Sequence, residues 1–439
     1  MNMSLLQTGS AALWLSTLMT FAQGPDLGGK WLVTVSHHGA IEYGTLTLKS
    51  AEGRFAGEMF GDAFSVALSD GHLEVRCQGK DSKGKECGLL KGRLSEDMME
   101  ASGTLYEEES SWRARKAPAI QRSANRHEFV PEVYYNEFSA RFEPALRINP
   151  GDTVHTRTVD AGGMDADGIH RAAGGNPLTG PFYIEGAWPG DTLAIRLDRV
   201  RLNRDTAGTY SDSVVLSALD PYYVADRKKV EDFDSTWKLD REKGIAVLTK
   251  PTDRLKNFQV KLAPMLGCIG VAPGGKESFR SGRLGNYGGN MDYNQIRQGT
   301  TVYLPVFQPG ALLFVGDGHA AQGDGELNGN ALETSMDVEF TVDVIHGKRI
   351  RGPRVESANQ IVAVGLAGSL DDAFRAATAG MAQWLTDDYG LTPSELAQVL
   401  GTSAEYKVSE AADRNAGIVL KINKERLSTL KPAAKPKSE

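Results

Sequence analysis

Residues 28–116 consist of short runs in which apolar and polar side chains alternate, as they do in strands with one buried face. Gly-containing pairs such as Glu52-Gly53 and Asp70-Gly71 separate the runs and are typical of hairpin turns. The runs have strand length and even spacing, and they lie at 31–35, 45–49, 65–69, 72–76, 89–94, 103–106 and 112–115. This pattern predicts a small antiparallel β-barrel or sandwich over residues 25–116.

The rest of the chain predicts further strands, followed by helices near its end. Alternating or apolar runs predict strands at 133–142, 151–160, 192–197, 311–315 and 337–343. Apolar residues then recur at helical spacing over 370–389, with Ser369 or Asp371 as the N-cap and Gly390 as the stop. A second helix is expected to begin at Pro393, because proline suits the first helical position.

These patterns predict a mainly β protein with α/β elements. A small N-terminal antiparallel domain at 25–116 would be joined by a polar linker at 117–127 to a larger β-rich domain with C-terminal helices at 128–431. Residues 432–439 are rich in proline and lysine, which predicts a disordered tail. Two turns contain the tripeptide Pro-Gly-Asp before a strand, at 150–152 and 189–191, which suggests two related β layers.

Composition narrows the function classes. Hydrophobic residues make up 41% of the chain and charged residues 24%, which is ordinary for a soluble globular protein. The net charge is −7 with both signs intermixed, so the basic face of a nucleic-acid-binding protein is not expected.

An apolar run at 11–21 has the length of a signal peptide and is too short to span a bilayer. A cut after Ala22 would release the mature chain, which predicts a signal peptide at 1–22 and a periplasmic or secreted protein. No lysine or arginine precedes Lys30, so the usual positive region is missing. The alternatives are a misassigned start or an apolar N-terminal arm.

The cysteines bear on the same question. Cys77 and Cys87 flank a short polar connector that resembles a hairpin turn, and a disulfide between them would fit an exported protein. Two buried thiols would instead fit a cytosolic protein. Cys268 lies between glycines far along the chain, where it is either a nucleophile or a small buried thiol, and packing is the better explanation.

The segment 310–343 carries most of the candidate chemistry. Its glycine-rich centre holds Asp317, His319, Gln322, Asp324 and Glu326 within ten residues. Carboxylates, an imidazole and an amide on a loop between two strands indicate a polar site rather than a slack linker.

This segment, GDGHAAQGDGE followed by SMDVEFTV, resembles the acetamidase/formamidase family. Four other blocks resemble the family in the same order, over roughly 128–431: TVDAGG, GGNPLTGPFYIEGAWPGDTLAIRL, GCIGVAP and GNYGGNMDYNQIRQGTTVYLPVFQPGALLF. The ends of the N-terminal module, GKW and SWRARK, resemble a lipocalin-like β module attached to some bacterial hydrolases. The resemblance implies an enzyme that hydrolyses the C–N bond of a short aliphatic amide of the formamide or acetamide type. It also implies a homo-oligomer.

The same resemblance suggests roles for residues in the family-like blocks. Asp160, His319 and Glu326 are expected to hold a divalent ion, zinc or calcium. Glu326 is also expected to act as the catalytic base. Contacts with the small amide are expected from Asn290, Asp292, Asn176 and Glu185. Turn capping explains Asp317 and Asp324 equally well, because Asp in glycine-rich turns often binds its own backbone.

Two other functions fit the same sequence. One is a non-catalytic envelope protein that binds through the β module, and the other is an amidase for a larger amidated sugar or peptide. Intact polar blocks favour catalysis over mere binding. An ammonia assay combined with titration of short amides would separate them.

Overall fold

The structure is a computed structural model that describes residues 26–51, 54–80, 86–118, 123–209, 213–225 and 233–431. The predicted signal peptide at 1–22 and tail at 432–439 lie outside these residues. The described residues divide into two compact units: the first consists of those up to Lys116 except Ala40–Gly44, and the second consists of Ala40–Gly44 and the residues after Lys116. Each unit is described by itself.

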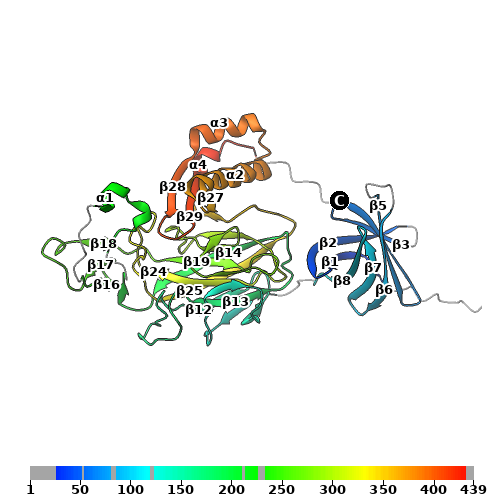
Figure 1. Cartoon of the computed structure of the whole chain (residues 1–439), viewed down its shortest axis with the longest axis horizontal. Coiled ribbons are helices and arrows are strands. Elements are labelled where there is room, and N and C mark those ends of the chain that lie inside the picture. Colours follow the sequence, from blue (N-terminus) through cyan, green and yellow to red (C-terminus); the bar gives the residue numbers. More distant parts are fainter. Residues whose placement is uncertain are drawn as a thin grey trace, which may run out of the picture. The chain divides into compact units, whose positions relative to one another are not determined.

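The N-terminal unit is a closed antiparallel barrel (Figure 1, blue to cyan). Its strands are β1 (Gly29–His37), β2 (Ala40–Ala51), β3 (Arg54–Met59), β4 (Asp62–Ser69), β5 (His72–Lys80), β6 (Glu86–Ser95), β7 (Met98–Leu105) and β8 (Glu108–Lys116). Pairing of β1 with β8 closes the barrel, so the sandwich alternative is wrong. Inward-facing Trp31, Leu46 and Phe64 fill the interior, since small barrels are packed by side chains.

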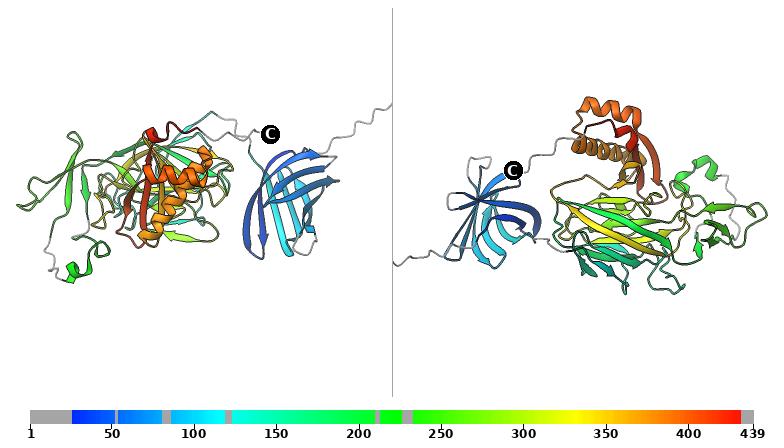
Figure 2. Two further views of the ribbon diagram at one scale, coloured as in Figure 1. Left: turned by 90° about the horizontal axis from the view of Figure 1, so that it is seen from above. Right: turned by 180° about the vertical axis from the view of Figure 1, so that it is seen from behind.

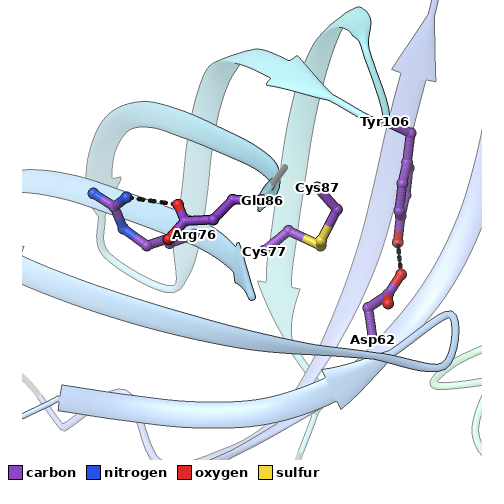
Figure 3. The surroundings of a disulfide bond; sticks show 6 residues. All are labelled: Asp62, Arg76, Cys77, Glu86, Cys87 and Tyr106. Atoms are coloured by element: carbon purple, nitrogen blue, oxygen red, sulfur yellow. Dashed lines mark hydrogen bonds and ion pairs between the residues drawn. A yellow bond between two sulfur atoms is a disulfide. The ribbon is translucent and has the colours of Figure 1, made fainter. Parts of the chain in front are cut away.

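A disulfide joins Cys77 of β5 to Cys87 of β6 (Figure 3). The two strands are antiparallel neighbours, so the bridge lies across the hairpin that the sequence predicts. Close by, the hydroxyl of Tyr106 donates a hydrogen bond to Asp62 at 2.8 Å. The alternative of two free thiols is therefore wrong for this pair.

The two largest sheets of the second unit have six and nine strands. The six-stranded sheet has the order β11 (Leu146–Ile148), β13 (Leu178–Ile184), β24 (Leu313–His319), β19 (Met265–Val271), β22 (Gly288–Asn290) and β21 (Leu284–Gly285). The nine-stranded sheet has the order β28 (Glu405–Glu410), β29 (Ala416–Asn423), β27 (Gln360–Ala367), β26 (Arg354–Glu356), β23 (Thr301–Pro305), β14 (Thr192–Leu202), β25 (Met336–Ile345), β12 (Thr153–Arg157) and β9 (Arg126–Glu128).

Apolar side chains of both sheets form one core. Phe182 of β13 meets Phe340 of β25 edge to face, with their ring centroids 5.3 Å apart. Every residue of β19 and β24 is buried, because these strands are central and covered. Along β25, by contrast, buried and half-buried residues alternate, as the sequence pattern predicts.

Smaller elements complete this unit. A four-stranded sheet contains β15 (Thr206–Gly208), β16 (Thr236–Asp240), β17 (Ile245–Leu248) and β18 (Gln259–Lys261), three of which are labelled in Figure 1. The pair β10 (Glu137–Ser139) and β20 (Ser278–Arg280) forms a separate ladder. Short turns of helix lie at η1 (Leu216–Ala218) and α1 (Pro221–Ala225).

Helices α2 (Leu370–Tyr389) and α3 (Pro393–Ser403) lie beside β27, β28 and β29 (Figures 1 and 2). Ser369 caps α2 and Gly390 ends it in the left-handed conformation, as predicted. Met381 and Trp384 of α2 belong to the same apolar cluster as Ile422 of β29. The last helix is α4 (Lys424–Leu427). Within the described residues, none of the helices has the length and apolar character needed to span a membrane.

Several sequence predictions need correction. The strand expected at 133–142 is reduced to β10, and the strand expected at 151–160 ends at Arg157. The predicted linker ends in a strand, β9. Both Pro-Gly-Asp turns precede strands of one sheet, β12 and β14, rather than two layers. In each turn the buried aspartate accepts a hydrogen bond from the backbone N–H three residues earlier.

Candidate functional site

Strand β24 carries Asp317 and His319 in its own ladder, not in the loop that the sequence suggested. Side chains two residues apart on a strand share a face, so Asp317 and His319 project together. Gly316 and Gly318 occupy the other face, where a Cβ would collide with Pro177 O and the Met336 side chain, respectively. The Gly-Asp-Gly-His sequence therefore combines close packing on one face with a polar pair on the other.

The neighbouring strands bring further polar groups to this face. Strand β19 pairs with β24 on one side and with β22 on the other, and β22 ends at Asn290. Asp292 follows two residues later, and its carboxylate accepts a hydrogen bond from the Asn290 amide. From the opposite side, Asn176 donates hydrogen bonds to Asn290 Oδ1 at 2.9 Å and Asp317 Oδ2 at 3.1 Å.

Three glutamates come from outside the sheet. Glu326 and Glu333 lie between β24 and β25, and Glu410 is the last residue of β28. Isolated backbone bridges pair Glu333 with His319, and Glu410 with Gly325, the residue before Glu326. All three side chains are buried.

His319 is the centre of the cluster. Its Nε2 lies 3.4 Å from Asp317 Oδ1 and 3.4 Å from Glu333 Oε2. Its Nδ1 lies 2.9 Å from Gln322 Oε1, and the Gln322 amide in turn donates to the Asp292 carbonyl at 2.6 Å. A glutamine oxygen only accepts, so Nδ1 carries the proton in this contact and leaves the Nε2 lone pair free in the neutral ring.

Several buried polar atoms of the cluster have no hydrogen-bond partner. They are Asp292 Oδ1, Asp317 Oδ1, His319 Nε2, Glu333 Oε2 and Glu410 Oε2. Buried polar groups are normally satisfied, so a convergent set of unpartnered acceptors indicates a missing positive partner. Three overlapping sets of side chains have ligand atoms within 4.8 Å of one another: Asp292–Asp317–His319, His319–Glu326–Glu333 and Asp292–Glu326–Glu410.

The electrostatics agree with this interpretation. Burial, then the Glu326 charge, raises the pKa of Asp292 well above its usual value, and burial with Glu333 and Glu410 does the same for Glu326. Burial also raises the pKa of Glu410 to about 7. For His319 burial lowers the pKa, but Glu333 and Asp317 outweigh it and raise the pKa well above the usual value. Among the described residues, no Lys or Arg forms an ion pair with these carboxylates.

The backbone at the cluster is unusual as well. Asn176, Asp292, Asp317 and Glu326 all have positive φ values, between 42° and 57°. Non-glycine residues adopt this conformation rarely, and such residues concentrate at functional sites. The cluster opens into a cavity of about 550 Å³ that Asn176, Asn290, Asp317, Glu326 and Glu333 help to line.

The predicted site residues separate into two groups. His319, Glu326, Asn290, Asp292 and Asn176 all belong to the cluster or its cavity. Glu185 lies at the end of β13, where it pairs with Arg147 at 3.1 Å and does not line the cavity.

The structure also places Asp160 outside the cluster. Its carboxylate is fully buried against Arg204 Nη2 at 2.5 Å and the Met164 N–H at 2.9 Å. Arg204 also donates to the Glu333 carbonyl at 3.4 Å. Asp160 therefore supports the backbone of Glu333 through Arg204 rather than facing the cavity.

Sequence reasoning did not assign Glu333, Glu410 or Gln322 a role. Glu333 stands just before the strand at 337–343, next to the family-like block, and that position is a usable signal. Glu410 comes from a distant β-strand, and nothing in its local sequence marks it, because only the folding of β28 against the 325 loop brings it in.

Cys268 is not placed as a nucleophile. Its Sγ lies 2.7 Å from Asn290 Oδ1, to which the thiol donates. Burial, then the charge of Asp317, raises the pKa of this thiol well above its usual value, which disfavours the reactive thiolate. Cys268 therefore helps to hold Asn290.

Sequence and structure comparisons with known proteins identify the same family over most of the second unit. A sequence model described as the acetamidase/formamidase family matches residues 122–278 and 275–364, more than half of the chain. A recombinant predicted acetamidase/formamidase from Thermoanaerobacter tengcongensis is 27% identical with a TM-score of 0.60, over 70% of this chain and 99% of that one. An acetamidase structure from Yersinia enterocolitica gives the same identity and TM-score, over 70% of this chain and 94% of that one.

Curated relatives match over shorter stretches. An acetamidase from Mycolicibacterium smegmatis is 43% identical over 61 residues, which is 14% of this chain and 15% of that protein. A formamidase-like protein from Schizosaccharomyces pombe is 29% identical over 194 residues, 34% of this chain and 47% of that protein. The chain thus spans less than half the length of these curated relatives.

Proposed function

Because the chain belongs to the acetamidase/formamidase family, we propose that it is an amidase that hydrolyses the C–N bond of linear amides, giving a carboxylate and ammonia. The observation that carries the proposal is the set of unpartnered acceptors around His319, inside the segment that the family model matches. Similarity to acetamidase structures over 70% of the chain supports it.

The donor set fits a divalent metal ion. Unpartnered oxygens of Asp317 and Glu333 each lie 3.4 Å from His319 Nε2. Asp292, Glu326 and Glu410 belong to the overlapping sets of possible ligands around them. Carboxylates alone would suit calcium, whereas an imidazole nitrogen favours zinc of the two ions. A divalent ion held here would polarise the amide carbonyl and make a bound water more acidic.

The side chains then have separate tasks. Asn176 and Asn290 hold the Asp317 and Asp292 carboxylates in place, and Gln322 keeps the proton of His319 on Nδ1. Glu326 is the group to take a proton from the attacking water and deliver it to the departing nitrogen. Its buried carboxyl lines the cavity, and a raised pKa suits a group that both accepts and donates a proton.

The test is ammonia release by the purified protein from formamide and acetamide, before and after removal of metal by a chelator. We expect turnover that is lost on chelation and restored by zinc. Elemental analysis should find bound divalent metal. Absence of turnover on all linear amides, in a folded and metal-loaded protein, would refute the amidase assignment.

A matched pair of variants tests the role of Glu326. Glu326→Gln should lower kcat by at least about 100-fold, because a positioned acid–base group contributes roughly that much. Asp324→Asn is the control, since Asp324 lies in the same loop but faces Lys407 at 2.6 Å and is half exposed. Equal activity in both variants would remove Glu326 from the mechanism.

Export and assembly complete the proposal. We propose a periplasmic or secreted protein, supported by the apolar run at 11–21 and by the Cys77–Cys87 disulfide, which oxidising compartments favour. We also propose a homo-oligomer, supported by exposed apolar residues such as Val130 and Val133. Cell fractionation and analytical ultracentrifugation would test these two points.

A further inference from the structure

A second cavity adjoins the cluster and differs from it in character. It has a volume of about 740 Å³, within the range of small-molecule sites. Its wall is mostly apolar and comes from the four-stranded sheet and the loops around it. The apolar residues that matter here are Trp237 of β16, Leu248 of β17, Leu255, Phe258, Leu327 and Leu332.

Two residues connect this cavity to the candidate reaction centre. Glu326 and Asn330 line both the polar cavity of about 550 Å³ and the apolar one. The proposed acid–base group therefore stands at the boundary between the two spaces. Apolar side chains that line the second cavity therefore lie close to the proposed acid–base group.

The apolar wall is exposed to a degree that calls for an occupant. Phe258 is 51% exposed and Leu327 is 46% exposed, and the ring of Phe258 meets that of Trp237 edge to face at 6.1 Å. Leaving such side chains in water costs free energy that an apolar ligand would recover. Formamide and acetamide are too small to cover this surface while their amide lies at the cluster.

We propose, resting on the proposed amidase function, that the substrates are primary amides with an aromatic or branched apolar group, and that this cavity binds that group. In the reaction the C–N bond breaks, and water gives its hydroxyl to the carbonyl carbon and a proton to the nitrogen. The carboxylic acid formed then passes its proton to ammonia, so that a carboxylate and ammonium result. Trp237, Leu255 and Phe258 act as specificity residues and leave the chemistry unchanged.

The experiment compares acetamide with phenylacetamide, 3-phenylpropanamide and 4-phenylbutanamide. We expect kcat/KM for the best phenyl-substituted amide to exceed that for acetamide by at least about tenfold, because apolar contacts of this size discriminate by that factor or more. Phe258→Ser should lower kcat/KM for the phenyl-substituted amides by a much larger factor than kcat/KM for acetamide, and so remove most of this advantage.

Phe374→Ser is the matched control. Phe374 is 44% exposed on α2 and does not line either cavity, so the preference for phenyl-substituted amides should persist. Thermal melts of both variants check folding, since each replaces a half-exposed ring by the same residue.

Calorimetric titration with 3-phenylpropanamide separates this inference from the amidase proposal. If no amide is hydrolysed but the compound binds the wild type and not Phe258→Ser, the amidase proposal fails and the apolar binding site stands. If acetamide is hydrolysed and Phe258→Ser changes neither the preference nor binding, the inference is overturned. A wild-type oligomer that dissociates in Phe258→Ser with unchanged selectivity would also overturn it, because a second copy would then cover the cavity.

Discussion

Gly267 of β19 lies where Asp292, Asp317 and His319 converge. A Cβ at this position would lie 2.6 Å from Asp317 Oδ2, 3.1 Å from His319 Cε1 and closer still to Asp292 Oδ1. Gly267 is not among the residues with positive φ, so the need for glycine here is space and not backbone conformation. The missing side chain is therefore part of how the cluster is built.

Gly267→Ala should displace these side chains and abolish most activity without unfolding the protein. We expect kcat/KM for amides to fall by about 100-fold, because displacements near 1 Å cost that much in a positioned site, and bound metal should fall as well. Gly274→Ala is the control, since the nearest atom to its added Cβ is 3.8 Å away. Wild-type activity and metal content in Gly267→Ala would show that the cluster is not the reaction centre.

At the same scale, local context singled out His319 and Glu326, which the structure places in the cluster, and Asp160, which it places outside. A buried aspartate after a strand resembles a ligand in sequence, and only the fold shows that Arg204 occupies its carboxylate. Asp317 was equally well explained as a turn residue, whereas its place in β24 directs it to the cluster. Residue type suggests the chemistry, and the partner of each side chain decides it.

Among the elements, helices were easier to predict than strands. Ser369, Gly390 and Pro393 set the ends of α2 and α3 through local backbone chemistry, so their positions follow from sequence alone. The start and end of β24 depend on its neighbours instead. Ala311 and Leu312 have positive φ and lie before the strand, which begins at Leu313, and pairing with β19 extends it to His319.

An ion-pair network links three strands at one edge of the nine-stranded sheet. His155 of β12 contacts Glu128 of β9 through Nδ1 and Asp337 of β25 through Nε2, both at 2.5 Å. Burial lowers the pKa of His155, but the two carboxylates outweigh it, so the net pKa is raised. Each acid also has an arginine partner: Arg126 forms an ion pair with Glu128, and Arg199 forms one with Asp337.

This arrangement predicts that His155 stabilises the protein more at low pH. The pKa of His155 is higher in the folded protein than in the unfolded chain, where it is about 6.5. Its contribution to stability is therefore fully present below about pH 6.5 and is lost as the pH rises through the pKa of the folded state. His155→Gln should therefore lower the free energy of unfolding more at about pH 5.5 than at about pH 9. Urea denaturation at the two pH values measures it.

His170→Gln is the control for this prediction, because His170 is exposed and has no ion pair among the described residues. It should change the free energy of unfolding equally at both pH values. A loss in His155→Gln that is the same at both pH values, or larger at the higher one, would contradict the assignment.

For the whole molecule, alternation predicted the barrel and the β-rich second unit, but not the topology of the sheets. Strands that pair across more than 100 residues, such as β13 with β24, leave no local signal. The four-stranded sheet was missed because its segment is polar and its single buried face is short. The apolar cavity next to Glu326 depends on this sheet, so sequence alone could not suggest the larger substrate's binding site.

Each unit has its own apolar core, which predicts separate responses to changes in their cysteines. Replacing both Cys77 and Cys87 by serine opens a ten-residue loop and should lower the stability of the barrel by about 2–3 kcal/mol, because the unfolded chain gains freedom. Cys268→Ser, which alters a buried thiol in the second unit, is the complementary control.

Hydrogen exchange followed by mass spectrometry separates peptides of the two units. We expect faster exchange in barrel peptides for the double variant and in peptides of the second unit for Cys268→Ser. The same increase throughout the chain in either variant would show that the protein unfolds as one cooperative whole.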